Sequence, residues 1–134
     1  MRSMRIFPYL LIFASTTTCA QAVKAELQCR LTRVDYVYDC AIRLARDGRP
    51  LAGAEVMLGA DMPSMPNAHA VKPVKAMPGK APGEYRANVD LEMLGEWAVT
   101  LHLAGPVKDR LILLYDFDEK GARPVRRAGR PLRK

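Results

Sequence analysis

The sequence contains no apolar run of about 20 residues, the length that a membrane-spanning helix requires. Its longest apolar stretch, residues 6–14, is too short and is broken by Pro8. The chain also lacks a Gly-x-Ser-x-Gly motif and a phosphate-binding glycine loop, and no nucleophile has a partner base that can be named. These absences argue against an integral membrane protein and against an enzyme.

The N-terminal segment has the order of a secretory signal peptide. Two arginines precede the apolar run, and Ala20-Gln21-Ala22 then supplies an Ala-x-Ala cleavage site. We therefore expect residues 1–22 to be removed on export to the periplasm. A lipoprotein anchored at Cys19 is the alternative, although Thr16 stands three positions before that cysteine, where an aliphatic residue is expected.

The formal net charge of +7 is unevenly distributed. Residues 119–134 hold seven Lys and Arg against Glu119 alone, whereas residues 23–118 hold 12 basic and 13 acidic residues. Because the segment 119–134 also contains Gly and Pro and few apolar residues, we expect a disordered basic tail after a domain of residues 23–118. Export removes nucleic acid as a partner, so the tail would serve solubility or a weak contact with an anionic membrane surface.

Cys29 and Cys40 are predicted to form a disulfide, because an even number of cysteines in a small exported domain favours a bridge. Apolar residues alternate with polar ones around both cysteines, as in half-buried strands. A chain reversal at residues 34–35 brings Cys29 opposite Cys40. The same register pairs Leu27 with Ile42 and Leu31 with Tyr38. A redox or thiolate-metal pair is less favoured, because a Cys-x-x-Cys spacing is absent.

The rest of the chain is predicted to be strands joined by turns. Extended patterns cover residues 51–58, 71–77, 85–91, 97–103 and 111–117, with turn residues at 47–50 and 78–83. The segment 111–117 is apolar on both faces, which predicts a central or covered strand. About seven short strands without a helical period favour an all-β fold, an immunoglobulin-like β-sandwich.

Soft metal ligands are concentrated between residues 61 and 69. Met62, Met65 and His69 offer two thioethers and an imidazole, a set that suits Cu(I). The two prolines of this segment favour polyproline II, which would place both thioethers on one side. Three further residues could complete the shell: Met57, Met77 and Met93. In the alternative interpretation the segment is a plain loop whose methionines fill gaps in the core.

The remaining histidine, His102, lies on the polar face of its predicted strand and is interpreted as a surface residue. Zinc usually takes four nitrogen or thiolate ligands. Two histidines and two disulfide-bonded cysteines cannot provide them.

Four segments resemble the YtkA-like domain, related to the FixH family of exported or membrane-tethered bacterial proteins. They are residues 53–56, residues 62–66 with His69, residues 82–85, and residues 93–97 with Val99 and Leu101. The resemblance implies an immunoglobulin-like sandwich and an association with copper homeostasis or with assembly of copper-containing oxidases.

Two functions are therefore expected. The first is a periplasmic copper-binding or copper-transfer protein that uses Met62, Met65 and His69 and serves a cuproenzyme or copper-transport partner. The second is a metal-free interaction module that docks on an envelope protein through a sheet edge or the basic tail.

Overall fold

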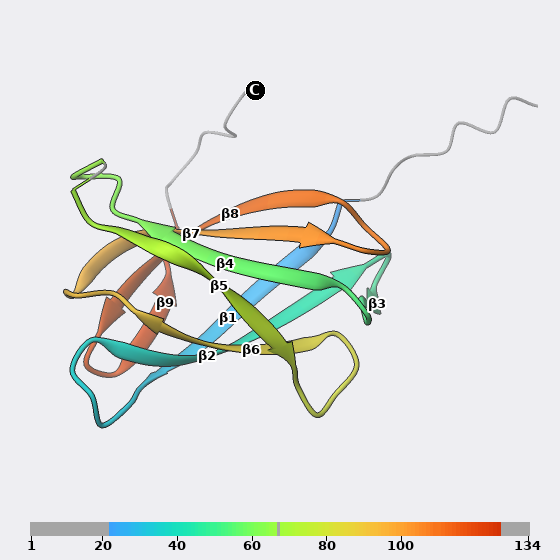
Figure 1. Ribbon diagram of the computed structural model, residues 1–134, viewed down its shortest axis with the longest axis horizontal. Helices are drawn as coiled ribbons and strands as arrows, with labels where there is room; N and C mark the ends of the chain where they lie inside the picture. Colours follow the sequence, from blue (N-terminus) through green and yellow to red (C-terminus); the bar gives the residue numbers. More distant parts are fainter. Residues whose placement is uncertain (1–21, 67, 127–134) are drawn as a thin grey trace, which may run out of the picture.

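A computed structural model describes residues 22–66 and 68–126 (Figure 1). Within these residues the chain forms nine β-strands and no helix, so it contains no helix able to cross a membrane. The strands are β1 (Lys24–Leu31), β2 (Val37–Arg46), β3 (Arg49–Pro50), β4 (Glu55–Asp61), β5 (Ala70–Pro78), β6 (Glu84–Asp90), β7 (Gly95–Ala104), β8 (Asp109–Asp118) and β9 (Gly121–Pro124). The all-β prediction is confirmed. The predicted signal peptide, apart from Ala22, lies outside the described residues.

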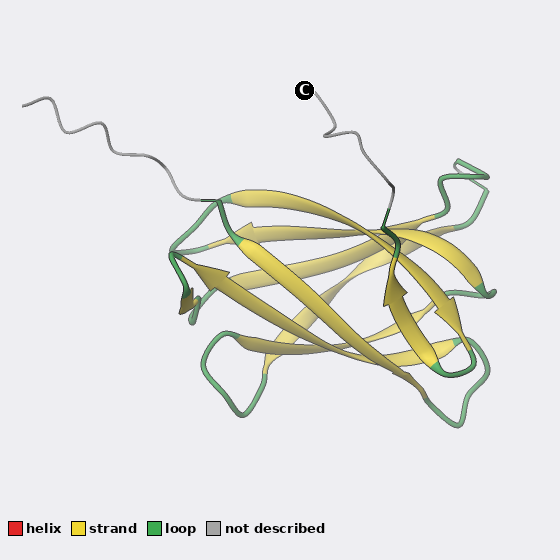
Figure 2. Cartoon of the chain, turned by 180° about the vertical axis from the view of Figure 1, so that it is seen from behind, coloured by secondary structure: helices red, strands yellow, loops and turns green. Residues whose placement is uncertain are grey.

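The strands follow one another around a nearly closed barrel, which is also compatible with a sandwich of two curved sheets (Figures 1 and 2). Their order is β1-β2-β6-β5-β4-β7-β8-β9, and the short β3 pairs with β2. β5 links the two halves, because it pairs with β4 along most of its length and with β6 through Met77 and Pro78. β9 lies beside β1, where the ring of strands meets itself.

The core fills the inside of this barrel with every second side chain of the strands, as the period-two pattern requires. Its largest fully buried residues are Trp97, Tyr38, Tyr85, Phe117, Ile42, Leu44, Leu58, Leu91, Leu101, Val56, Val89 and Val99. The rings of Tyr38 and Phe117 meet edge to face with centroids 5.0 Å apart. The Tyr85 hydroxyl donates to the Leu51 carbonyl at 2.8 Å and accepts from the Ala54 amide, which ties the chain between β3 and β4 to β6.

The β1–β2 hairpin has the predicted register. Cys29 pairs with Cys40 and forms the disulfide. The flanking pairs are Leu27 with Ile42 and Leu31 with Tyr38. Backbone hydrogen bonds close the reversal, from the Thr32 amide to the Val37 carbonyl and from the Val37 amide to the Val34 carbonyl.

The predicted tail of residues 119–134 begins too early. Residues 121–124 form β9, which pairs with β8 from Tyr115 to Asp118 and therefore belongs to the domain. The prediction was wrong here because basic residues and glycine hid a short strand in which Ala122, opposite Phe117, packs against the core. Gly121 comes so close to β1 that an added β-carbon would lie 2.5 Å from the Cys29 carbonyl oxygen. Residues 127–134 lie outside the described part.

Side-chain hydrogen bonds join β1 and β2 to β8 at this seam, where β1 and β9 are the two ends of the strand order. The Tyr115 hydroxyl on β8 accepts a hydrogen bond from the Leu27 amide on β1 at 3.0 Å, and the Tyr38 hydroxyl donates to the Asp118 carbonyl at 2.7 Å. β8 thus has neighbours on both sides over its second half, as its apolar sequence predicted. In its first half Ile112 is 57% exposed, so that part is not covered within the described structure.

Candidate functional site

Two loops at one end of the barrel hold the predicted ligands (Figure 1). The first loop, residues 62–69, joins β4 to β5, and the second, residues 91–94, joins β6 to β7. We call this the ligand end. β4 and β6 both run toward it, so the chain order places the two loops at the same rim.

The register of the β4–β5 hairpin brings Met62 and His69 to facing positions. Asp61 pairs with Ala70 in the last rung of the ladder, and Met62 and His69 are the next residue on each side. Two residues that are far apart within the loop are therefore held near its base by the strands. Met65 lies in the turn between them.

The loop forms two consecutive turns instead of the predicted polyproline II segment. The Met65 amide donates to the Met62 carbonyl at 3.1 Å, and the Ala68 amide donates to the Met65 carbonyl at 3.2 Å. Pro63 occupies the second position of the first turn, where its fixed φ is favourable. The polyproline expectation was wrong because the short connection between paired strands requires the chain to reverse.

The turns place the two thioethers in different environments. Met62 is 5% exposed and belongs to the core cluster, whereas Met65 is 39% exposed. The terminal methyl of Met62 lies 3.4 Å from the position that a β-carbon on Gly95 would occupy. Met62 thus extends inward beneath the start of β7, and Met65 is open to a partner.

The structure adds a residue that sequence reasoning missed. Nδ1 of His69 lies 3.3 Å from Oε2 of Glu92 in the 91–94 loop. The His69 side chain is 31% exposed and that of Glu92 is 67% exposed. No local spacing signals this contact, because 23 residues separate the two in sequence.

Of the methionines considered as further ligands, only Met93 lies at the ligand end, in the 91–94 loop and partly buried against the core. Met57 points to the outer face, opposite His102 on β7. Met77 is 61% exposed and pairs with Arg86 on β6. His102 is exposed, as expected for a surface histidine.

The donor set at the ligand end differs from that of a carboxylate or zinc-type site. Among residues 22–66 and 68–126, no three His, Cys, Asp or Glu side chains come together in a metal-binding group. Asp61 has a buried Oδ1 atom with no hydrogen-bond partner in the described structure.

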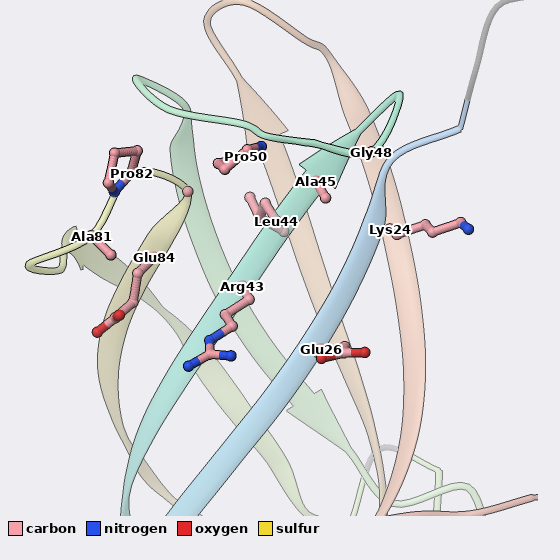
Figure 3. Close-up of a pocket in the computed structure, with 11 residues that line it drawn as sticks. Lys24, Glu26, Arg43, Leu44, Ala45, Gly48, Pro50, Ala81, Pro82 and Glu84 are labelled. Atoms are coloured by element: carbon pink, nitrogen blue, oxygen red, sulfur yellow. The ribbon is translucent and has the colours of Figure 1, made fainter.

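A surface hollow of about 380 Å³ lies toward the opposite end of the barrel (Figure 3). In the strand register Arg43 on β2 lies opposite Glu26 on β1 and opposite Glu84 on β6. Pro50 and Pro82 lie above these residues in Figure 3. Among the described residues, no methionine or histidine lines this hollow. It therefore offers charged and apolar contacts but no soft metal ligand.

A second groove, of about 780 Å³, follows the seam between β1 and β8 beyond the end of β9. Leu27, Ile112 and Tyr115 line it together with Val125 and other residues of the three strands. The Val125 amide donates to the Leu114 carbonyl at 2.9 Å, so the chain stays hydrogen-bonded to β8 for one residue after the end of β9.

Comparison with known families gives a match to the central part of the chain. A family model described as YtkA-like matches residues 36–102, half of the chain. The chain belongs to the YtkA-like family. The match to the YtkA-like domain runs from the start of β2 into β7, so it includes both loops of the ligand end but neither β1 nor β9. No curated protein and no solved structure matches the chain.

Proposed function

We propose that this YtkA-like protein binds Cu(I) in the periplasm and transfers it, with Met62, Met65 and His69 as ligands. The observation that carries the proposal is the hairpin register that holds Met62 and His69 at facing positions with Met65 in the turn between them. Two thioethers and one imidazole form a donor set that favours Cu(I) over harder ions.

The different exposure of the two sulfurs supports transfer as well as binding. Met65 and His69 are accessible at the rim and can meet an incoming ion first. Met62 is flexible about three side-chain bonds and can turn outward from beneath β7 to complete the site. An ion held by two accessible ligands and one retractable ligand can pass to a copper-transport or cuproenzyme partner without unfolding of the strands.

Export to an oxidising compartment is part of the proposal. The disulfide of the β1–β2 hairpin supports it, because such bridges form and persist outside the reducing cytoplasm.

The test is an anaerobic Cu(I) titration of residues 23–134 against a competing chelator. We expect Met65→Ala, His69→Ala and Met62→Leu each to weaken Cu(I) binding by at least about tenfold. This is the loss of affinity expected when a metal ligand, or a residue that orients one, is removed. Met62→Leu removes the sulfur while nearly conserving the buried volume.

Two matched variants serve as controls. Met77→Ala removes an exposed methionine and His102→Ala removes an exposed histidine, both outside the ligand end. The control variants should bind Cu(I) like the unmodified protein. Equal binding by all five variants would refute the site.

A metal-free interaction module is a second proposal, and the groove between β1 and β8 supports it. Its apolar lining and its two bounding strands suit an extended, apolar segment of an envelope protein that adds as a strand. Ile112→Glu should then abolish capture of the partner, with or without a copper chelator. Deletion of residues 127–134 distinguishes docking in this groove from docking through the basic tail, because the deletion leaves β9 in place.

A further inference from the structure

We propose that Glu92 is a positioning residue that fixes the tautomer and orientation of His69, so that Nε2 is the nitrogen that binds Cu(I). This inference rests on the proposed copper function and names the geometry of the same site. The juxtaposition of the 62–69 loop with the 91–94 loop carries it.

The contact between Glu92 and His69 determines which nitrogen is available. A carboxylate only accepts hydrogen bonds, so Nδ1 of His69 must carry the proton that it donates to Oε2 of Glu92 at 3.3 Å. In a neutral imidazole the other nitrogen, Nε2, then has the free lone pair. A soft cation at the loop therefore meets Nε2.

The backbone of the 91–94 loop is built to present Glu92. Glu92 has φ of +62°, a left-handed conformation that is costly for a residue with a side chain. Local hydrogen bonds maintain it, from the Met93 amide to the Leu91 carbonyl at 2.7 Å and from the Glu92 amide to Oδ1 of Asp90.

The loop is also anchored to the rest of the barrel. The Leu91 amide donates to the Tyr36 carbonyl at 3.0 Å, and Leu91 is fully buried. The Trp97 indole nitrogen donates to the Met93 carbonyl at 3.3 Å. Glu92 therefore stands on a turn that is fixed on both sides, and strained residues held in this way often serve a site.

The expected effect on copper affinity is that of a carboxylate which orients a ligating histidine. Loss of such a partner typically weakens metal binding by about 10- to 100-fold. Glu92→Ala removes the acceptor and adds no new backbone strain, since alanine and glutamate meet the same restriction at positive φ. Glu92→Gln keeps an acceptor oxygen and should restore the contact.

The first readout needs no copper. Nitrogen-15 NMR of the His69 imidazole at mildly alkaline pH distinguishes the two neutral tautomers. We expect the Nδ1–H form in the unmodified chain and in Glu92→Gln, and a shift to the Nε2–H form, which free histidine prefers, in Glu92→Ala. Glu55→Ala, which removes an exposed acid at the start of β4, should leave the tautomer unchanged.

The second readout is the chelator-competed Cu(I) affinity of the same variants. We expect a loss of about 10- to 100-fold for Glu92→Ala and less than about threefold for Glu92→Gln and Glu55→Ala. An unchanged tautomer or an unchanged affinity in Glu92→Ala would overturn the positioning role.

The two readouts also separate this inference from the proposed function. If the unmodified protein binds Cu(I) and Glu92→Ala binds it equally well, only the role of Glu92 fails. If the unmodified protein binds no Cu(I), the proposed function fails and the copper-positioning role fails with it, whatever the tautomer of His69.

Discussion

Replacement of Gly121 by alanine tests whether contact between β9 and β1 completes the domain. Gly121 has φ of +134°, and a β-carbon there would lie 2.5 Å from the Cys29 carbonyl oxygen. The backbone conformation alone costs an L-residue about 1–3 kcal/mol. Relief of the collision requires β9 or β1 to move, and overpacking of this kind costs about 1–3 kcal/mol more. We therefore expect Gly121→Ala to lower the free energy of unfolding by about 2–6 kcal/mol.

Gly48→Ala is the matched control, because Gly48 also has a positive φ, +70°, but a β-carbon there has nothing within 4 Å. Its cost should be the conformational part alone, about 1–2 kcal/mol. Urea unfolding followed by the fluorescence of the buried Trp97 measures both values. Hydrogen exchange should also accelerate at the Leu27 amide in Gly121→Ala. Equal stability losses in the two variants would refute the close approach of β9 to β1.

Three further predictions concern the scaffold. The double variant Cys29→Ala/Cys40→Ala should lose about 3 kcal/mol in urea unfolding, from the entropy of a loop closed by residues 11 apart; a loss below about 1 kcal/mol would contradict this. Tyr85→Phe removes a hydroxyl with two backbone partners and should lower the free energy of unfolding by about 1–3 kcal/mol. An unchanged melting temperature would exclude a stabilising role of this hydroxyl. Hydrogen bonding to Arg86 holds the pKa of Asp39 below its usual 3.8, so the resulting stability is present above pH 3.8 and is lost as the pH falls through the lowered pKa. Asp39→Asn should therefore lose less stability than the unmodified protein on acidification below that pH, and parallel acid-unfolding curves would argue against the pKa shift.

Much of the fold could be predicted from local sequence because its strands are built from neighbouring segments. The alternation around Cys29 and Cys40 is enough to set the register of β1 and β2, since a shift of one residue would turn every apolar side chain outward. The same period located β6 and β7. β9 escaped prediction because four residues with small and basic side chains carry no apolar alternation.

The candidate ligands could be chosen from the sequence, but their arrangement could not. Residue type alone marks Met62, Met65 and His69 as soft ligands. The inward direction of Met62 depends on its place after β4, and its contact near Gly95 depends on β7. Sequence reasoning also offered Met57 and Met77 among the residues that could complete the shell, and the barrel turns both to outer faces away from the loop.

The sequence by itself determined the all-β class, the hairpin with its disulfide and the choice of candidate soft ligands, because alternation, cysteine pairing and side-chain chemistry act over short distances in the chain. Only the tertiary structure decided that β9 meets β1 and that Glu92 meets His69. Both contacts join segments that the chain separates widely, and the curvature of the sheet brings them together when its inner face is buried.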